Sequence, residues 1–300
     1  MNPLDAESHF LEVNGLDIHY YVAGDPTAPT VILLHGGGID SAKVAWRHLT
    51  PVLARTHRVY APDLPGYGES SPPNAPYTTR LLIDTVRGFI AGLGIGACAL
   101  LGLSMGGATA LGYTLEHPEQ VTRLILVDSY GLQRHAPLHP LSVMALRLPQ
   151  PITRWTWAQI AQSRPMLWSG LAAIYFNRLA LDAQTLADAA ESIHLDLFYA
   201  WLAGEVRPEG CLTDYSDQLP TLHTPTLLIH GQFDPSIPLV WGQQAADRLP
   251  NGQLVMIPLA GHWVNRERPS LFNREVVKFL LAEEKQKGDR SFDEIRHYSE

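Results

Sequence analysis

The sequence predicts an α/β fold, in which a mostly parallel, doubly wound sheet carries helices on both faces and a helical cap is inserted between two strands. Two observations predict this fold. Short β-branched and aliphatic runs alternate with segments whose apolar residues recur at helical spacing, which indicates successive strand–helix–strand units. Between residues 132 and 218, strand-like runs disappear and helix-like ones dominate. The chain can bury one large core, because 46% of its 300 residues are hydrophobic and only 17% are charged.

The first part of the predicted core extends over residues 1–131. Continuous apolar runs predict strands at His19–Val22, Val31–His35, His57–Ala61, Ala97–Leu103 and Val121–Val127. Helical spacing predicts helices at Thr78–Ala91 and Gly106–Glu116. The charge-free stretch 88–115 is long enough to span a bilayer. Its eight glycines fit a buried strand, a tight turn and a buried helix better than a membrane helix.

The predicted cap comprises residues 132–218 and contains four of the seven tryptophans, Trp155, Trp157, Trp168 and Trp201. These aromatic residues form either the core of the cap or one wall of a substrate pocket. The alternating pattern resumes over 219–300, with strands at Thr226–His230 and Gln253–Ile257 and helices at Val240–Leu249 and Pro269–Leu281. From Glu283 onward the chain is expected to be a polar tail.

Charge and cysteine content exclude several classes of protein. A net charge of −8 argues against a nucleic-acid partner, because phosphate binding requires clustered basic residues. Cys98 and Cys211 are far apart and in no CxxC pattern, so we expect neither a disulfide framework nor a metal cluster. The first ten residues contain no apolar signal core, so nothing directs export and a cytoplasmic location is expected. The expected partner is a small-molecule substrate, and no membrane binding is expected. A homo-oligomer remains open.

The sharpest chemical signal is Gly102-Leu103-Ser104-Met105-Gly106, a G-x-S-x-G motif between a predicted strand and a predicted helix. In such a turn the serine backbone is strained, and the glycines let the flanking segments approach closely. The hydroxyl is then exposed at the sheet edge, above a helix N-terminus that favours a developing anion. Ser104 is therefore the candidate nucleophile.

A serine hydroxyl needs a base, and of the thirteen histidines His262 is the best candidate. It follows the last apolar strand and precedes the last helix, where a loop reaches over the sheet edge. The acid that orients it is either Asp234, after the strand at 226–230, or Asp128, after the preceding strand. Asp234 is preferred, because its loop matches the chain order Ser…Asp…His one strand before the histidine, and Asp128 is more simply a loop cap.

An anion-binding site is expected beside the nucleophile. The glycine run Gly36-Gly37-Gly38, which follows His35 after an early strand, supplies backbone N–H groups. The residue after the nucleophile, Met105, supplies another. These signals lie at the ends of the appropriate strands and in the appropriate order.

On these motifs the chain resembles an α/β-hydrolase with a helical cap over nearly its whole length. The matching pieces are HGGG at 35–38, DLPGYGES at 63–70, GLSMGG at 102–107, GQFD at 231–234 and GHW at 261–263. The runs SMGGATAL and GHWVNRERPSLFN are very similar to those of meta-cleavage-product hydrolases, serine enzymes that cut carbon–carbon bonds in ring-fission products of aromatic compounds.

The resemblance implies the roles of individual residues. Ser104, Asp234 and His262 fall on the family's catalytic triad, and Gly37 and Met105 fall on its oxyanion hole. Trp263 falls on an aromatic residue that packs near the substrate. Gly36, Gly38 and Leu103 complete the predicted substrate-binding set.

Two positions depart from the meta-cleavage-product pattern. Leu103 stands where that subfamily has an asparagine that contacts the substrate carboxylate, and an alignment of 181–193 puts Ala189 at the position of a cap arginine. Losing both contacts removes charge-assisted bonds worth roughly 1.5–3 kcal/mol each. Another cap arginine can replace them only if it reaches the pocket, and the candidates are Arg147, Arg154, Arg164, Arg178 and Arg207. Epoxide hydrolases and haloalkane dehalogenases need Asp at the nucleophile position, so Ser104 excludes them.

The sequence thus predicts a serine hydrolase of carboxylic esters or related acyl compounds, with no metal or organic cofactor. The alternative enzyme is a carbon–carbon bond hydrolase of meta-cleavage products. The alternative outside enzymes is a ligand-binding module with the same fold.

Overall fold

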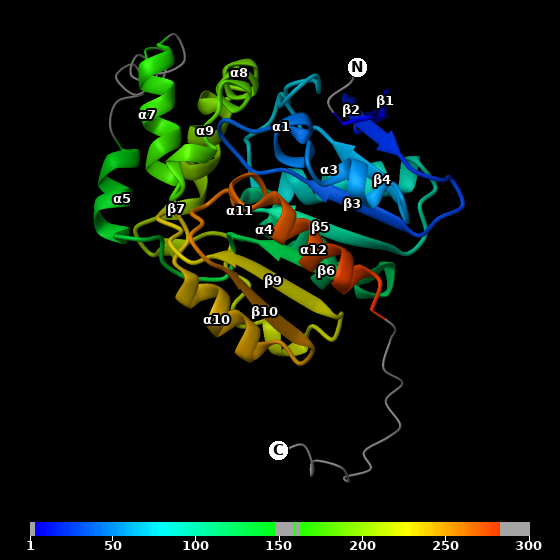
Figure 1. Cartoon of the computed structure of the whole chain (residues 1–300). Coiled ribbons are helices and arrows are strands. Elements are labelled where there is room, and N and C mark those ends of the chain that lie inside the picture. Colours follow the sequence, from blue (N-terminus) through cyan, green and yellow to red (C-terminus); the bar gives the residue numbers. More distant parts are fainter. Residues whose placement is uncertain (1–3, 148–158, 160–162, 283–300) are drawn as a thin grey trace, which may run out of the picture.

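The computed structural model describes residues 4–147, 159 and 163–282. Its main element is an eight-stranded sheet with the spatial order β1-β2-β4-β3-β5-β6-β9-β10 (Figure 1). β2 pairs antiparallel with β1 and β4, and every other pair in this sheet is parallel. The strands are β1 (Glu7–Val13), β2 (Leu16–Ala23), β3 (Thr30–Leu34), β4 (Arg58–Pro62), β5 (Cys98–Leu103), β6 (Val121–Val127), β9 (Thr226–Gly231) and β10 (Gly252–Ile257). The predicted α/β fold with a mostly parallel sheet is confirmed.

Helices cover both faces of this sheet. One face packs against α1 (Ala42–Trp46), α2 (Thr50–Leu53), α11 (Val264–Glu267) and α12 (Pro269–Leu280). The other packs against α3 (Thr79–Gly92), α4 (Met105–Glu116) and α10 (Leu239–Arg248). Short 3₁₀ turns occupy Pro118–Gln120, Arg178–Ala180 and Leu219–Thr221.

Strand β3 shows why the predicted strands are continuous apolar runs. Val31 and Leu33 belong to the core on the α1 and α12 face, and Ile32 and Leu34 to the core on the α3 and α4 face. Successive side chains of a strand point to opposite faces, so a strand covered on both sides is apolar at every position.

The charge-free stretch 88–115 forms the end of α3, the buried strand β5 and the buried helix α4, as predicted. Within the residues that the structure describes, no helix has the length and apolar character needed to cross a membrane.

Two predictions about strands are wrong. Strand β1 is absent from the predicted elements, because its residues are mostly exposed and carry no apolar run. The segment 132–218 was expected to lack strands, yet β7 (Val206–Arg207) and β8 (Gly210–Cys211) form a small antiparallel ladder there. Two-residue strands are too short to leave a periodic signal.

Between β6 and β9 the chain forms helices α5 (His139–Leu146), α7 (Arg164–Ile174), α8 (Ala183–Glu191) and α9 (Leu195–Glu205). Figure 1 shows them together at one end of the sheet, and we call them the cap helices. The domain boundaries at 131/132 and 218/219 stay predictions. Trp155, Trp157 and the predicted tail from Glu283 lie outside the described residues.

A buried ion-pair cluster joins the cap helix α8 to the core. Asp188 forms ion pairs with Arg47 and, at 3.5 Å, with Arg266 of α11. The side chains of Asp188 and Arg266 are only 2% and 3% exposed. Arg266 also donates to the carbonyl oxygen of Val44. At the rim of the same contact, Lys43 pairs with the exposed Glu191.

Replacing Asp188 with asparagine is expected to lower the free energy of unfolding by about 3–5 kcal/mol, because two arginines would lose the anion that compensates them. The matched control is Glu191→Gln, which breaks an exposed pair and is expected to cost below about 1 kcal/mol. Urea denaturation of both variants measures the difference. Equal losses would show that the buried cluster does not stabilise the fold.

Candidate active site

The turn between β5 and α4 holds Ser104 in strained backbone, with φ 52° and ψ −114°. Non-glycine residues seldom adopt a positive φ. A Cβ on Gly102 would lie 2.2 Å from the carbonyl oxygen of Gly106, and one on Gly106 would lie 2.3 Å from that of His35. Both glycines of the motif are therefore required by close backbone approach, as the sequence predicts. Ser104 precedes the first residue of α4, so it stands at the N-terminus of that helix.

The glycine loop after β3 is tied down on both sides of Gly37. Gly36 N–H donates to Asp40 Oδ2 at 2.8 Å, and Gly38 N–H donates to the hydroxyl of Tyr67 at 3.2 Å. His35 Nε2 accepts from Leu64 N–H at 2.9 Å, so its Nδ1–H donates to the Gly36 carbonyl oxygen at 2.7 Å. These bonds fix the peptide planes around Gly37.

Gly37 N–H, by contrast, has no hydrogen-bond partner within the described residues. Met105 N–H belongs to the first turn of α4, whose N–H groups have no partner inside the helix. A Cβ on Gly37 would lie 3.4 Å from the sulfur of Met105, so the two residues are neighbours. The N–H groups of Gly37 and Met105 are therefore the candidates for binding an anion here.

Phe198 of cap helix α9 packs directly on this loop. A Cβ on Gly37 would lie 2.3 Å from Phe198 Cδ2, and one on Gly38 would lie 3.4 Å from Phe198 Cδ1. The Phe198 ring is stacked on Trp201, with centroids 5.8 Å apart, and Trp201 contacts Tyr130 edge-on. An aromatic wall from the cap therefore closes one side of the glycine loop.

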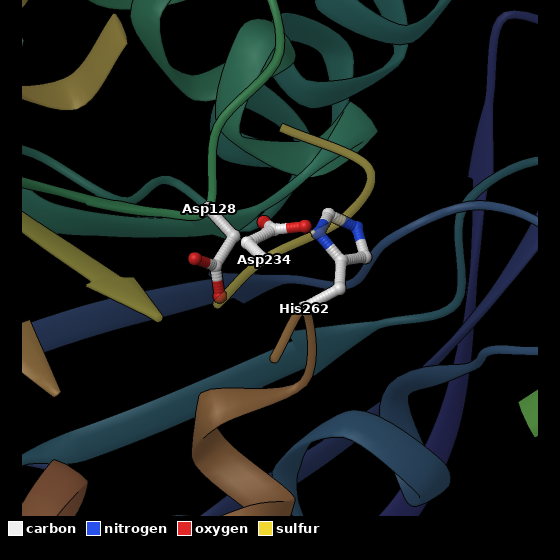
Figure 2. A group of neighbouring side chains, drawn as sticks. All are labelled: Asp128, Asp234 and His262. Carbon is white, nitrogen blue, oxygen red and sulfur yellow. Dashed lines mark hydrogen bonds and ion pairs between the residues drawn. The ribbon is translucent and has the colours of Figure 1, made fainter. Parts of the chain in front are cut away.

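On the neighbouring strands, Asp234 and His262 are in direct contact. Asp234 Oδ2 lies 2.7 Å from His262 Nδ1 (Figure 2). Asp234 Oδ1 accepts from the N–H groups of Ser236 at 2.7 Å and Ile237 at 3.0 Å. Asp234 follows β9 and His262 follows β10, so adjacent parallel strands deliver both residues to one edge of the sheet. With Nδ1–H donating to Asp234, Nε2 is the free nitrogen of the neutral ring.

The contact changes the pKa of both groups. Burial alone would lower the pKa of His262, but the charge of Asp234 and the hydrogen bond to it outweigh burial and raise the pKa. Burial likewise opposes ionisation of Asp234, and the charge of His262 and its hydrogen bond lower the pKa of that carboxyl. The pair therefore favours an ionised aspartate beside a histidine that binds a proton readily.

The hydrogen bonds of His262 in the described part of the chain join its ring to Asp234 and its backbone N–H to the carbonyl oxygen of Ile174. Ser104 is not among these partners, so the structure brings the serine to the same sheet edge without a hydrogen bond to the imidazole. Such bonds are often long before substrate binds and tighten in the complex.

The other predicted substrate-binding residues are buried. Leu103 is fully buried beneath the glycine loop, since a Cβ on Gly36 would lie 3.6 Å from its Cγ. Trp263 packs edge-on against Tyr175 of the cap, with ring centroids 5.7 Å apart. Ala189, on cap helix α8, is also fully buried in the hydrophobic core.

Sequence reasoning missed two carboxylates that organise the site. Asp40 accepts from Gly36 and from Ser41 N–H, and burial raises its pKa to about 7. Glu267 accepts from Gly261 N–H and from Asn177 N–H of the cap, each at 2.7 Å, and so ties the histidine loop to the cap. Asp40 stands two residues after the glycine run, and an aspartate in such a loop commonly accepts a hydrogen bond from a nearby backbone N–H. Nothing in the spacing indicates the long-range partner of Glu267.

A metal ion is the alternative occupant of this cluster, because one side-chain atom each from Asp128, Asp234 and His262 lies within 4.8 Å of the others. The 2.7 Å separation of Asp234 Oδ2 and His262 Nδ1 is a hydrogen-bond distance. Two ligands of one zinc ion, each about 2.0–2.1 Å from the metal at tetrahedral angles, would stand further apart. The three residues as arranged fit a hydrogen-bonded cluster.

Comparison with known proteins identifies the family of the fold. Residues 29–269 match the family described as the alpha/beta hydrolase fold. The 2-hydroxy-6-oxo-6-(2'-aminophenyl)hexa-2,4-dienoic acid hydrolase of Metapseudomonas resinovorans is 29% identical over 275 residues, which cover 90% of each chain.

Two solved structures are also similar. The meta-cleavage product hydrolase of Pseudomonas fluorescens IP01 superposes with a TM-score of 0.76 at 25% identity, covering 92% of this chain and 98% of that one. A membrane phospholipase A superposes with a TM-score of 0.74 at 25% identity, covering 93% and 86%. The family match spans more than half of the chain, so this protein belongs to the alpha/beta hydrolase fold family and is a hydrolase.

Proposed function

We propose that the protein is a serine hydrolase of neutral carboxylic esters or related acyl compounds. The observation that carries the proposal is the hydrogen-bonded Asp234–His262 pair at the same sheet edge as the strained Ser104. The N–H groups of Gly37 and Met105, which are free to bind an oxyanion, support it further. A nucleophile, a base, an orienting acid and an anion site are the parts that acyl transfer needs.

In the proposed mechanism, Ser104 Oγ attacks the substrate carbonyl while His262 Nε2 accepts its proton. Asp234 holds the imidazole in the required tautomer and stabilises the imidazolium. The N–H groups of Gly37 and Met105 bind the oxyanion of the tetrahedral intermediate. His262 then protonates the leaving group and later activates the water that hydrolyses the acyl-enzyme.

The activity is expected to rise with pH as His262 loses its proton, because only the neutral imidazole can accept a proton from Ser104. Since Asp234 raises the pKa of His262, the midpoint of the acid limb of kcat/KM is expected above the ordinary imidazole value of 6.5. A pH–rate profile with an uncharged ester isolates this group, since the substrate does not titrate. A midpoint below 6.5 would mean that Asp234 does not act on the catalytic base.

The environment of the site favours an uncharged substrate. Leu103 and Ala189 are apolar and buried, so neither offers a polar contact to a substrate carboxylate. Of the cap arginines named above, Arg147, Arg164, Arg178 and Arg207 are exposed, and Arg154 lies outside the described residues. An anion that meets only these buried apolar side chains loses its hydration without a compensating cation, and the cost persists in the transition state.

Neutral esters are therefore expected to have a higher kcat/KM than an anionic dienone ring-fission product. Steady-state kinetics on p-nitrophenyl esters of graded chain length, beside such a dienone, measures the preference. A dienone preferred by about tenfold or more over every neutral ester would show that another cap cation anchors the carboxylate.

The second candidate function is carbon–carbon bond hydrolysis of a meta-cleavage product. The names of the Metapseudomonas and Pseudomonas relatives favour it, and the same kinetic comparison decides between the two reactions. A ligand-binding module would turn over neither substrate. The proposed reaction needs a small-molecule substrate and no cofactor, and the free thiols of Cys98 and Cys211 are consistent with the proposed cytoplasmic location.

A further inference from the structure

The proposed mechanism leaves one buried acid of the site without a task. Asp128 follows the last residue of β6, lies next to Asp234 and is fully buried. Its Oδ1 accepts from Gly231 N–H at 2.8 Å, as a loop cap does. Its Oδ2 is buried and has no hydrogen-bond donor facing it within the described residues. A buried carboxylate oxygen without a donor is costly, because ionised groups lose strong hydration on burial.

Within the part of the chain that the structure describes, no lysine or arginine forms an ion pair with Asp128. The titratable groups that face it are Asp234, Glu267 and His230, with His262 in the same cluster. His230 Nε2 is 3.7 Å from Asp128 Oδ1, but it donates instead to the carbonyl oxygen of Ile237 at 2.8 Å. Burial lowers the pKa of His230, so its ring is neutral near neutral pH. Asp128 and Asp234 therefore lie close together beside two histidines. His230 Nε2 is 3.8 Å from Asp234 Oδ2, and His262 is the histidine that forms a hydrogen bond with Asp234.

We propose that Asp128 is a positioning residue that works as a neutral acid, with a proton on Oδ2 that it donates to the Asp234 carboxylate. The proton gives the orphan oxygen Oδ2 a hydrogen bond and leaves one negative charge, rather than two, beside His262. Asp234 can accept this bond. Its Oδ1 already accepts two hydrogen bonds, from Ser236 and Ile237, but its Oδ2 accepts only one, from His262, and has a second lone pair.

The electrostatics of the cluster support this protonation state. Burial, the charge of Asp234 and a side-chain hydrogen bond to it raise the pKa of Asp128 well above its usual range, and the Gly231 N–H only partly opposes them. Of two adjacent buried carboxyls, one ionises and the other keeps its proton. His262 selects Asp234 as the ionised one, because it contacts Asp234 directly.

The consequence for catalysis rests on the proposed function. One aspartate charge raises the affinity of His262 for a proton moderately, whereas a second charge would raise it further. An imidazole that stays protonated at neutral pH cannot accept the proton of Ser104. Asp128 in its neutral form therefore keeps His262 available as a base while it orients Asp234.

Asp128→Asn tests the protonation state by kinetics, because the amide donates a similar hydrogen bond and carries no charge. We expect the acid limb of kcat/KM to keep its midpoint. A midpoint that falls by about one pH unit or more would overturn the proposal, because it would show that a negative charge had been removed.

Asp128→Ala, which donates nothing, is expected to lower kcat by about tenfold or more without raising KM, and Asn is expected to restore most of the loss. Equal kcat for Ala and Asn would contradict a donor role.

A second measurement needs no turnover and so separates this proposal from the proposed function. Infrared difference spectra compare the unmodified protein with each variant. They are recorded at a pH above the pKa of Asp40, which is about 7, so that Asp40 is ionised. The protonated-carboxyl band of the unmodified protein is expected to disappear in Asp128→Asn and to persist in Ser104→Ala. If Asp128→Asn does not fold, carbon-13 NMR of aspartate-labelled unmodified protein serves instead. Absence of a protonated aspartate signal in that pH range would overturn the proposal whatever the enzyme hydrolyses.

Discussion

Replacement of Ser104 by alanine is expected to abolish hydrolysis while the fold stays intact. The members of a triad act as a unit, so loss of the nucleophile should reduce kcat by about 10⁴-fold or more. The alanine variant is expected to keep the same turn, because the close approach of Gly102 and Gly106 to the neighbouring backbone fixes its conformation. Circular dichroism and thermal unfolding establish that the variant is folded, and initial rates on the best ester measure the loss.

The matched control for this experiment is Ser129→Ala. Ser129 lies near the same sheet edge and is buried, whereas Ser104 is half-buried, and the Ser129 hydroxyl donates to the carbonyl oxygen of Tyr130. This variant is expected to retain most of the activity. A Ser104→Ala variant that keeps about a tenth of the original rate would show that another group is the nucleophile.

Replacement of Asp234 by asparagine is expected to cost far more activity than the same change at Asp128. Asp234 Oδ2 accepts the Nδ1–H of His262 at 2.7 Å and so keeps Nε2 free to act as a base. An amide NH₂ in that place would donate to Nδ1 and favour the wrong tautomer, an effect worth roughly 10⁴-fold in a serine protease. Asp128 lies behind Asp234 and bonds to Gly231, so its neutral amide is expected to cost less than about tenfold, below 1.4 kcal/mol.

Each asparagine variant replaces one carboxylate oxygen with an NH₂ group, so the two variants control for each other. Each leaves the volume of a buried aspartate unchanged, so a difference in rate reflects which carboxylate serves His262. Single-turnover rates on one ester give the comparison. Equal losses, or a larger loss at Asp128, would show that the orienting acid follows β6 rather than β9.

The parts of the site that were predicted from the sequence are those set by local geometry. The G-x-S-x-G turn, the glycine run and the loop that carries His262 each lie next to a buried strand, and such strands leave a strong apolar signal. Parallel neighbours in a sheet bring their carboxyl ends to one edge, which is why Asp234 and His262 meet. Strand β1 was missed because it has a mostly exposed surface and no apolar run.

The parts that were not predicted depend on contacts between distant segments. Phe198 of α9 packs on Gly37, and Glu267 joins the histidine loop to Asn177 of the cap. Asp188 pairs with Arg47 and Arg266, which are far apart in the sequence. None of these pairings has a spacing signature, because they follow from how the cap is placed on the sheet. The shape of the substrate pocket depends on the same placement, so it too could not be predicted from the pattern.

The most direct test of the account is the reaction of the intact protein with a fluorophosphonate probe, followed by mass spectrometry of its peptides. The probe reports an activated serine and requires no knowledge of the substrate. The account predicts one adduct, on Ser104, which disappears in Ser104→Ala and forms much more slowly in Asp234→Asn than in Asp128→Asn. An unlabelled Ser104 in a folded protein, or an adduct on another serine, would contradict it.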